Sequence, residues 1–481
     1  MNLTLSKAGL IKIRLVIWLL FSVYLVTSFF IIESFDLKVS IVITGVLIQL
    51  TLIEFLSNWQ KLGRPKLLDW FRLSTFLGLV LNFLFLIFLL DNRDGLLVHN
   101  VVIVNSKIAL KCLLVILTAL ISLKLGEYIS KELPQLRTRK LNEYRHLLLL
   151  KNLNLLYFII GCFAVAKIYL VINGFIDFDS NPKNLNPFQS LINQITITWT
   201  PIFLVFMSII IFRYEYSDRR FYLVFIVFLV LQVILGFLSG SKESIISPIL
   251  IVGIPYLISG KKISLKYFLS FLVIVVLIYP INNRFRSLTN QGLELSQPQM
   301  VKEAISKTLE NNISESFVLG LESYQKRVSM FAILMYSIEN EKYWNEYKFM
   351  DRYVFLPIAW IVPRIVLPNK PTADIGRRLY EMTTGNDSTS ITPTTYGWAY
   401  MEGGTIYVLL SFILLGIAIG YFELNLSLSN PLGLMIYALI LIRLLKIEFD
   451  IYSMITSILQ IVLLCLITNK MFFSQKKIKI G

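Results

Sequence analysis

The stretch FYLVFIVFLVLQVILGFL, residues 221–238, carries no charged side chain and is long enough to cross a bilayer as a helix. Such a segment must be helical in hydrocarbon, because its backbone polar groups have no water to bond there. Similar apolar stretches recur along the whole chain. The predicted spans are residues 15–32, 37–56, 71–90, 108–123, 153–172, 191–212, 221–239, 245–259, 267–281, 404–422, 431–445 and 451–472. We therefore predict an all-α polytopic membrane protein with about 12 transmembrane helices.

The composition excludes a soluble protein of ordinary type. Of the 481 residues, 56% are hydrophobic and only 16% are charged. The first apolar run ends at Ile32 without a small-residue cleavage site, so we expect a retained span rather than a removed signal peptide. The net charge of +16 does not require a nucleic-acid partner, because its distribution along the chain has a topological explanation.

Lysine and arginine are concentrated in alternate loops, which sets the predicted orientation. With the N-terminus inside, the cytoplasmic segments carry 23 of these residues and the short outer loops carry 5. Basic residues are retained on the cytoplasmic side of membranes. We predict a multi-pass membrane protein with both termini in the cytoplasm.

The spans divide the chain into three parts. Residues 1–281 hold spans one to nine, residues 282–396 form one large outer loop, and residues 397–481 hold spans ten to twelve and a basic cytoplasmic tail. The loop carries 13 Lys/Arg and 12 Asp/Glu, so a basic site within it requires local clustering.

The large loop is predicted to be partly helical. Apolar residues recur at helical spacing over residues 300–311 and 314–340. The following apolar stretch cannot form a continuous spanning helix, because four prolines interrupt it: Pro357, Pro363, Pro368 and Pro371. We interpret it as a surface-lying or re-entrant segment.

Metal and cofactor chemistry has little support in the sequence. The three cysteines lie in apolar runs without a CxxC pair, and the chain has two histidines. The outer segments contain no paired DxD-type carboxylates. We expect no metal and no other cofactor.

Four polar clusters on the predicted outer face are candidates for a site. They are the turn GFLSGSKES (236–244), the segment NNRFRS (282–287), the segment VPRIVLPNKPTADIGRRLYE (362–381) and the aromatic segment YGWAYMEGG (396–404). Each has a simpler interpretation: a solvated turn, snorkelling arginines, helix-surface ion pairs and an interfacial aromatic belt, respectively.

Together these clusters suit a lipid-linked diphosphate. The guanidinium of arginine binds phosphate oxygens in bidentate fashion and stays charged at physiological pH. Tyrosine and tryptophan rings could stack on sugars, and the proline-broken apolar chain could line a groove for a polyprenyl tail. The predicted substrate-binding residues are Arg284, Arg286, Arg364, Lys370, Arg377, Arg378, Tyr380, Tyr396, Trp398 and Lys242.

The layout resembles that of the Wzy-type polymerases, which polymerise O-antigen and capsular repeat units. The resemblance rests on about twelve spans, cytoplasmic ends and one large late outer loop. At residue level it covers Val362 to Gly420, where VPRIVLPNKP, IGRRLYE and TPTTYGWAYMEGG lead into a glycine-bearing span.

The resemblance implies a reaction. The growing glycan, linked through diphosphate to undecaprenol, would be transferred en bloc onto the next lipid-linked repeat unit. Partners would be these lipid-linked oligosaccharides, the bilayer, a chain-length regulator and a flippase. Arginines would stabilise the diphosphate leaving group, and a carboxylate would take the acceptor proton. The candidate bases are Asp374, Glu381 and Glu402.

Two alternatives stay open. O-antigen ligases share the layout but typically carry a functional histidine in the large outer loop, whereas residues 282–396 contain none. A lipid-linked oligosaccharide flippase would explain the charges inside spans, namely Glu54, Lys111, Lys167 and Arg443. It would not explain the single long loop, and transporters usually show two similar halves.

The topology can be tested by cysteine labelling of intact cells. A cysteine placed at Asn312 or Asn386 should react with an impermeant reagent from outside, and one placed within residues 131–145 should not. The parent protein, with its native Cys112, Cys162 and Cys465, serves as the control. Labelling of both regions from the same side would refute the topology.

Overall fold

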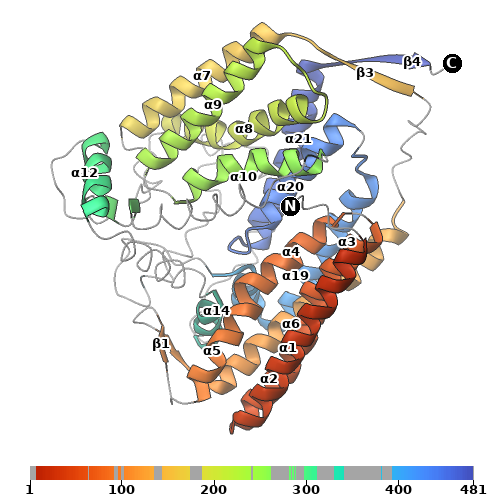
Figure 1. Cartoon of the computed structure of the whole chain (residues 1–481), viewed down its shortest axis with the longest axis vertical. Helices are drawn as coiled ribbons and strands as arrows, with labels where there is room; N and C mark the ends of the chain where they lie inside the picture. The colour runs from red at the N-terminus through yellow and green to blue at the C-terminus, as the bar shows by residue number, and fades with distance from the viewer. Residues whose placement is uncertain are drawn as a thin grey trace.

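The computed structural model describes residues 7–62, 64–91, 96–98, 102–134, 144–173, 187–239, 242–259, 261, 281–282, 284–285, 288, 297–310, 330–340, 381, 393–428 and 430–479. Within these residues the chain is mostly helical, with four short strands. The helices form two groups, one above the other in Figure 1.

The lower group in Figure 1 contains the first six helices together with α14 and α19. Two π-helical turns, Gln49–Ile53 and Phe76–Val80, join α2 to α3 and α4 to α5. The helices of this group are α1 (Lys7–Ile31), α2 (Phe35–Ile48), α3 (Glu54–Leu62), α4 (Leu67–Thr75), α5 (Leu81–Asp91), α6 (Ser106–Glu132), α14 (Met330–Glu339) and α19 (Thr395–Asn425).

The second group packs around α8. Its α20 contacts both α8 and α4, so it joins the two groups, and α12 (Gln297–Glu310) lies against α9. The helices are α7 (Leu153–Ile172), α8 (Pro187–Phe212), α9 (Arg219–Leu238), α10 (Lys242–Ile258), α20 (Pro431–Leu444) and α21 (Ile451–Phe472).

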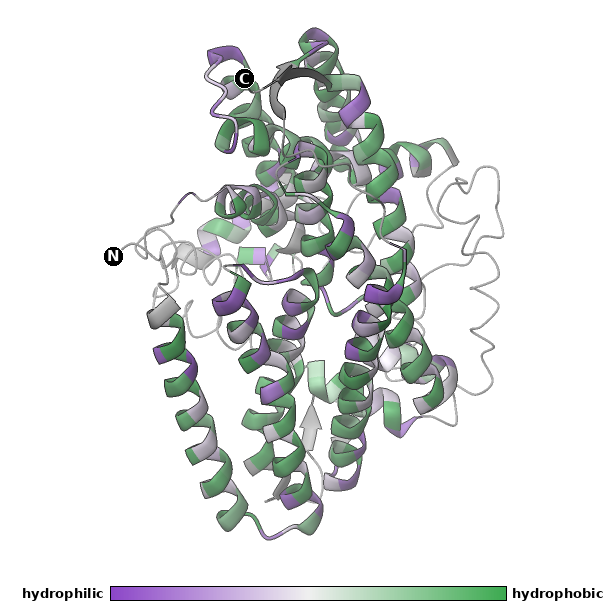
Figure 2. Cartoon of the chain, turned by 90° about the vertical axis from the view of Figure 1, so that its right-hand side faces the viewer, coloured by the Kyte–Doolittle hydropathy of each residue, from purple (hydrophilic) through white to green (hydrophobic). Residues whose placement is uncertain are grey.

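The protein is a multi-pass membrane protein. Nine helical segments of the described chain are long and apolar enough to cross a membrane, and apolar residues cover most of their length in Figure 2. Eleven of the twelve predicted spans fall on described helices. The ninth, residues 267–281, lies outside the described residues except for Ile281, so the total of twelve stays a prediction.

Two sequence expectations need correction. The helix predicted over residues 108–123 continues to Glu132, because the charges that seemed to end it form ion pairs with neighbouring helices. Helix α19 begins at Thr395, inside the predicted loop, since packing buries its first turns. Two short antiparallel strand pairs lie outside the predicted spans and leave the helical class unchanged: β1 (Leu96–Val98) with β2 (Val102–Val104) and β3 (Tyr144–Leu150) with β4 (Phe473–Lys479).

Parts of the predicted large loop are described. Helix α12 confirms the helix predicted over residues 300–311, whereas only α14 is described within the predicted helix 314–340. Helix α14 packs against α5, α6 and α19, and the Phe331 and Phe83 ring centroids lie 5.1 Å apart. The proline-broken segment lies outside the described residues.

Glycines allow α6 and α19 to approach closely. A Cβ atom added at Gly126 would lie 2.2 Å from the Ile413 carbonyl oxygen, and one added at Gly416 would lie 2.3 Å from that of Leu123. Small residues permit such backbone contact between membrane helices. The close approach brings the end of α6, with Glu127, beside the end of α19, with Glu423.

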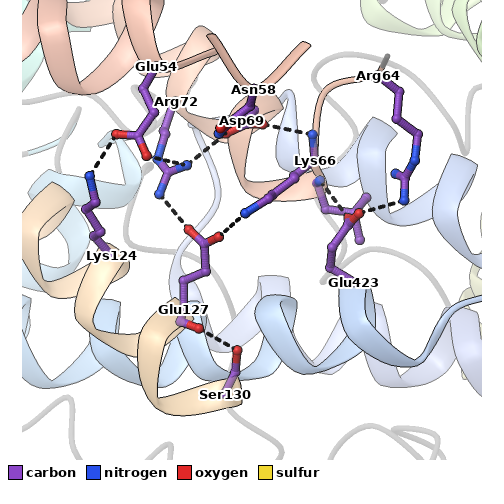
Figure 3. A network of polar contacts seen from close by, with 11 residues as sticks. Glu54, Asn58, Arg64, Lys66, Asp69, Arg72, Lys124, Glu127, Ser130 and Glu423 are labelled. Atoms are coloured by element: carbon purple, nitrogen blue, oxygen red, sulfur yellow. Dashed lines mark hydrogen bonds and ion pairs between the residues drawn. The ribbon is translucent and has the colours of Figure 1, made fainter. Parts of the chain in front are cut away.

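A network of ion pairs joins these helix ends to α3 and α4 (Figure 3). Arg72 is only 2% exposed, and its guanidinium lies 2.8 Å from Asp69, 2.9 Å from Glu127 and 3.6 Å from Glu54. Lys66 lies 2.6 Å from Glu127. Because one guanidinium meets carboxylates from three helices, Arg72 fixes how those helices pack.

Two further ion pairs extend the network, one between α6 and α3 and one between α19 and the turn that joins α3 to α4. Lys124 lies 3.1 Å from Glu54, and Arg64 lies 2.9 Å from Glu423. Glu423 also accepts a hydrogen bond from the backbone N–H of Leu67 at 2.9 Å. The four cations and four carboxylates balance, so this arrangement is self-contained and has a structural role.

Replacing Arg72 with Met should destabilise the protein by about 3–5 kcal/mol, because Asp69 would stay buried without its cation and Glu127 would keep only Lys66. The measurement is the thermal unfolding midpoint of the purified protein in detergent. Lys131→Met is the control, since Lys131 is exposed on α6. Equal midpoints for the two variants would contradict a central role for Arg72.

Candidate anion-binding site

Most of the predicted diphosphate surface cannot be placed. Arg284 and Glu381 are described and exposed, and Lys242 opens α10. Within the described part of the chain, no hydrogen bond or ion pair joins Arg284 or Glu381 to another predicted site residue. The remaining loop positions lie outside the described residues: Arg286, Arg364, Lys370, Asp374, Arg377, Arg378 and Tyr380.

The aromatic segment predicted to face a sugar is instead packed inside the protein. Tyr396 is 0% exposed, its hydroxyl lies 2.7 Å from that of Thr75, and its ring packs between Phe71 and Phe412. Trp398 and Glu402 are also buried. In this structure the Tyr396 ring is therefore inaccessible to a sugar, and its described contacts are those of a core residue.

Helix α19 is interrupted directly after Glu402. Gly404 has φ +67° and ψ −158°, a conformation that is essentially restricted to glycine. The part before the break is anchored to the segment that follows α20. There the Thr395 hydroxyl donates to the carbonyl oxygens of Ile447 at 3.0 Å and Phe449 at 2.7 Å. The break thus separates a short anchored helix from the long spanning one.

A cavity of about 380 Å³ lies in the second group of helices. Its wall includes apolar side chains such as Ile202, Ile251 and Leu439. The polar side chains of the wall come from α7, α8, α9, α10, α20 and α21 and from the residues after α20, and they are Lys167, Thr198, Thr200, Gln232, Ser244, Ser247, Arg443, Lys446, Ser457 and Gln460.

Four polar residues of the cavity lie at corresponding helix ends. Lys167 and Gln232 lie in the last two turns of α7 and α9, Ser244 lies in the first turn of α10, and Arg443 lies in the last turn of α20. The chain reverses direction between successive spans. These are therefore the ends that the charge pattern predicts to be outside.

Hydrogen bonds and ring contacts hold the cations of the cavity in place. The half-buried Lys167 ammonium donates to Gln232 Oε1. Arg443 Nε donates to Ser457 Oγ at 2.6 Å, and its guanidinium lies 4.4 Å from the centre of the Phe449 ring. Lys446 lies 5.7 Å from the same ring.

The cavity differs in charge from the Arg72 network. Among the described residues that line it, three are cations and none is a carboxylate. Positive charge gathered in a partly apolar, membrane-embedded cavity attracts anions more strongly than it would in water. The arrangement can therefore bind and orient an anion.

Sequence reasoning found part of this site. It identified Lys167 and Arg443 as charges within spans, although it assigned them to a possible transport path. It missed Gln232, Ser457 and Lys446. The signal for Gln232 was its position as a polar residue in the uncharged stretch 221–238.

One comparison with known proteins gives a match. The sequence model of a family described as a domain of unknown function (DUF8712) matches residues 163–473. That range is more than half of the chain and includes every residue that lines the cavity. No curated protein and no solved structure matches the chain.

Gly404→Ala should destabilise the protein by about 1–3 kcal/mol, because alanine cannot adopt the native backbone conformation without strain. Gly161→Ala in α7 is a matched control. At both positions nothing lies within 4 Å of an added Cβ atom, but only Gly404 has positive φ. Thermal midpoints in detergent would give the comparison, and equal values would show that the break in α19 tolerates alanine.

Proposed function

Because the chain belongs to the DUF8712 family, whose description assigns no function, we propose its function from its own chemistry. The protein is a polysaccharide polymerase of the bacterial plasma membrane. It transfers a glycan from undecaprenyl diphosphate onto the next lipid-linked repeat unit at the outer face.

The observation that carries this proposal is the cationic cavity at the helix ends predicted to be outside. A lipid-linked diphosphate combines an anionic head with a long apolar tail, so its head must be bound close to the bilayer. The cavity provides three cations among membrane helices and also has an apolar part to its wall. Its volume of about 380 Å³ lies within the range of small-molecule sites.

The proposed reaction uses few protein groups. The acceptor hydroxyl oxygen forms a bond to the anomeric carbon of the donor, and the bond from that carbon to the diphosphate oxygen breaks. Undecaprenyl diphosphate leaves with the electron pair, and fixed cations stabilise its charge. A carboxylate takes the hydroxyl proton.

The base remains to be chosen among Asp374, Glu381 and Glu402. Glu402 is buried next to the break in α19, and Glu381 is exposed. The predicted loop arginines would bind phosphate from the outer side. No histidine is available in residues 282–396, which favours a polymerase over a ligase.

A second candidate function is transport of lipid-linked oligosaccharides. It is favoured by the position of Lys167 and Arg443 within apolar helices, where charges often mark a translocation path. The two functions predict different products in cells that lack the protein. Loss of a polymerase leaves single repeat units at the cell surface, whereas loss of a flippase leaves lipid-linked units on the cytoplasmic leaflet.

The direct test is polymerisation by purified protein in liposomes that contain the lipid-linked repeat unit. The wild type should yield a ladder of glycan lengths. Arg443→Ala should lower the rate about tenfold or more, because charged contacts of this kind are worth several kcal/mol. Arg213→Ala, at an exposed arginine after α8, should retain the wild-type rate.

Unchanged single units in the wild-type reaction would refute the polymerase. Movement of those units across the bilayer in the same liposomes would establish the transporter instead.

A further inference from the structure

We propose that Lys167, Gln232 and Arg443 together bind one phosphate-type oxyanion in the cavity. This inference rests on the proposed function for its biological role, since the oxyanion would be the lipid-linked diphosphate. Its ligand chemistry is argued from the side chains alone.

The strongest evidence is the incomplete hydrogen bonding of the buried Gln232 amide. This side chain is 0% exposed and lies in the cavity wall. Its Oε1 accepts a hydrogen bond from Lys167, and its Nε2 has no hydrogen-bond partner among the described residues. A buried amide N–H₂ group without a partner is costly, so such a group calls for an acceptor that binds beside it.

The orientation of this amide is fixed chemically. If the Gln232 oxygen and nitrogen exchanged places, an N–H₂ donor would face the Lys167 ammonium, which also can only donate. Lys167 therefore holds the carboxamide with its Nε2 directed away from the ammonium. Both groups keep donor capacity in the wall of the cavity that they line.

Arg443 supplies a third donor from another helix, held in place before any ligand arrives. Its Nε bonds to Ser457, and its planar group stacks on Phe449. Preorganised donors bind an anion without having to be ordered first. Donors that line one cavity from three helices, α7, α9 and α20, suit the tetrahedral oxygens of phosphate better than the two oxygens of a planar carboxylate.

Two sources of this ligand are possible, a lipid headgroup and free inorganic phosphate or pyrophosphate. The apolar part of the wall favours the lipid. The experiment uses the full chain in nanodiscs of neutral phosphatidylcholine, with two separate probes, inorganic pyrophosphate and undecaprenyl diphosphate. Binding is measured by ³¹P NMR line broadening and by the shift of the thermal unfolding midpoint.

Gln232→Leu is the decisive variant. It removes the amide while it keeps a similar volume, and because Lys167 loses its acceptor, the unliganded protein should fold but be less stable than the wild type, with a lower thermal unfolding midpoint. The dissociation constant for the bound probe should rise about tenfold or more. Lys167→Met should weaken binding similarly. Arg213→Ala, as the matched cation control, should bind like the wild type.

The outcomes separate the possibilities. Binding of both probes, or of undecaprenyl diphosphate alone, with loss in Gln232→Leu supports the site. Absence of binding, or binding that is unchanged in that variant, would overturn it. Glucuronate serves as a carboxylate comparison, and a response to glucuronate without one to the two phosphate probes would also overturn it. Site-dependent binding without glycan polymerisation would refute the proposed function and leave the oxyanion site in place.

Discussion

Charge placed among membrane helices must be paired or hydrogen-bonded, because an isolated ion in a low-dielectric interior is costly. The structure meets this requirement around Arg72, which contacts carboxylates from α3, α4 and α6. Glu423 extends the arrangement to α19 through Arg64 and the backbone of Leu67. The packing of the first helix group, including the close approach of α6 and α19, depends on this balance of charge.

The cavity in the second helix group has a different arrangement of charge. Among the described residues that line it, three are cations and none is a carboxylate, and Gln232 adds a buried donor. This contrast with the Arg72 network is the physical basis on which we propose a structural role for the network and ligand binding for the cavity.

Hydropathy predicted the existence of most spans because lipid-facing helices are apolar along their length. It failed where burial within protein replaced contact with lipid. The charges of Lys124 and Glu127 seemed to end a span but form ion pairs with Glu54 and Arg72 on neighbouring helices. Tyr396 seemed to mark an aromatic mouth but packs against Phe71 and Phe412. The cavity could not be derived from one sequence, since its donors lie far apart in the chain and meet only through tertiary packing.

The short segment 445–450 links the cavity to the rest of the protein. Phe449 stacks against Arg443 in the cavity wall, and its carbonyl oxygen accepts from Thr395 at the start of α19. The neighbouring Ile447 packs beside Gly78 in the π-helical turn of the first helix group. Because the predicted outer loop ends at residue 396, its end is fixed beside the cavity.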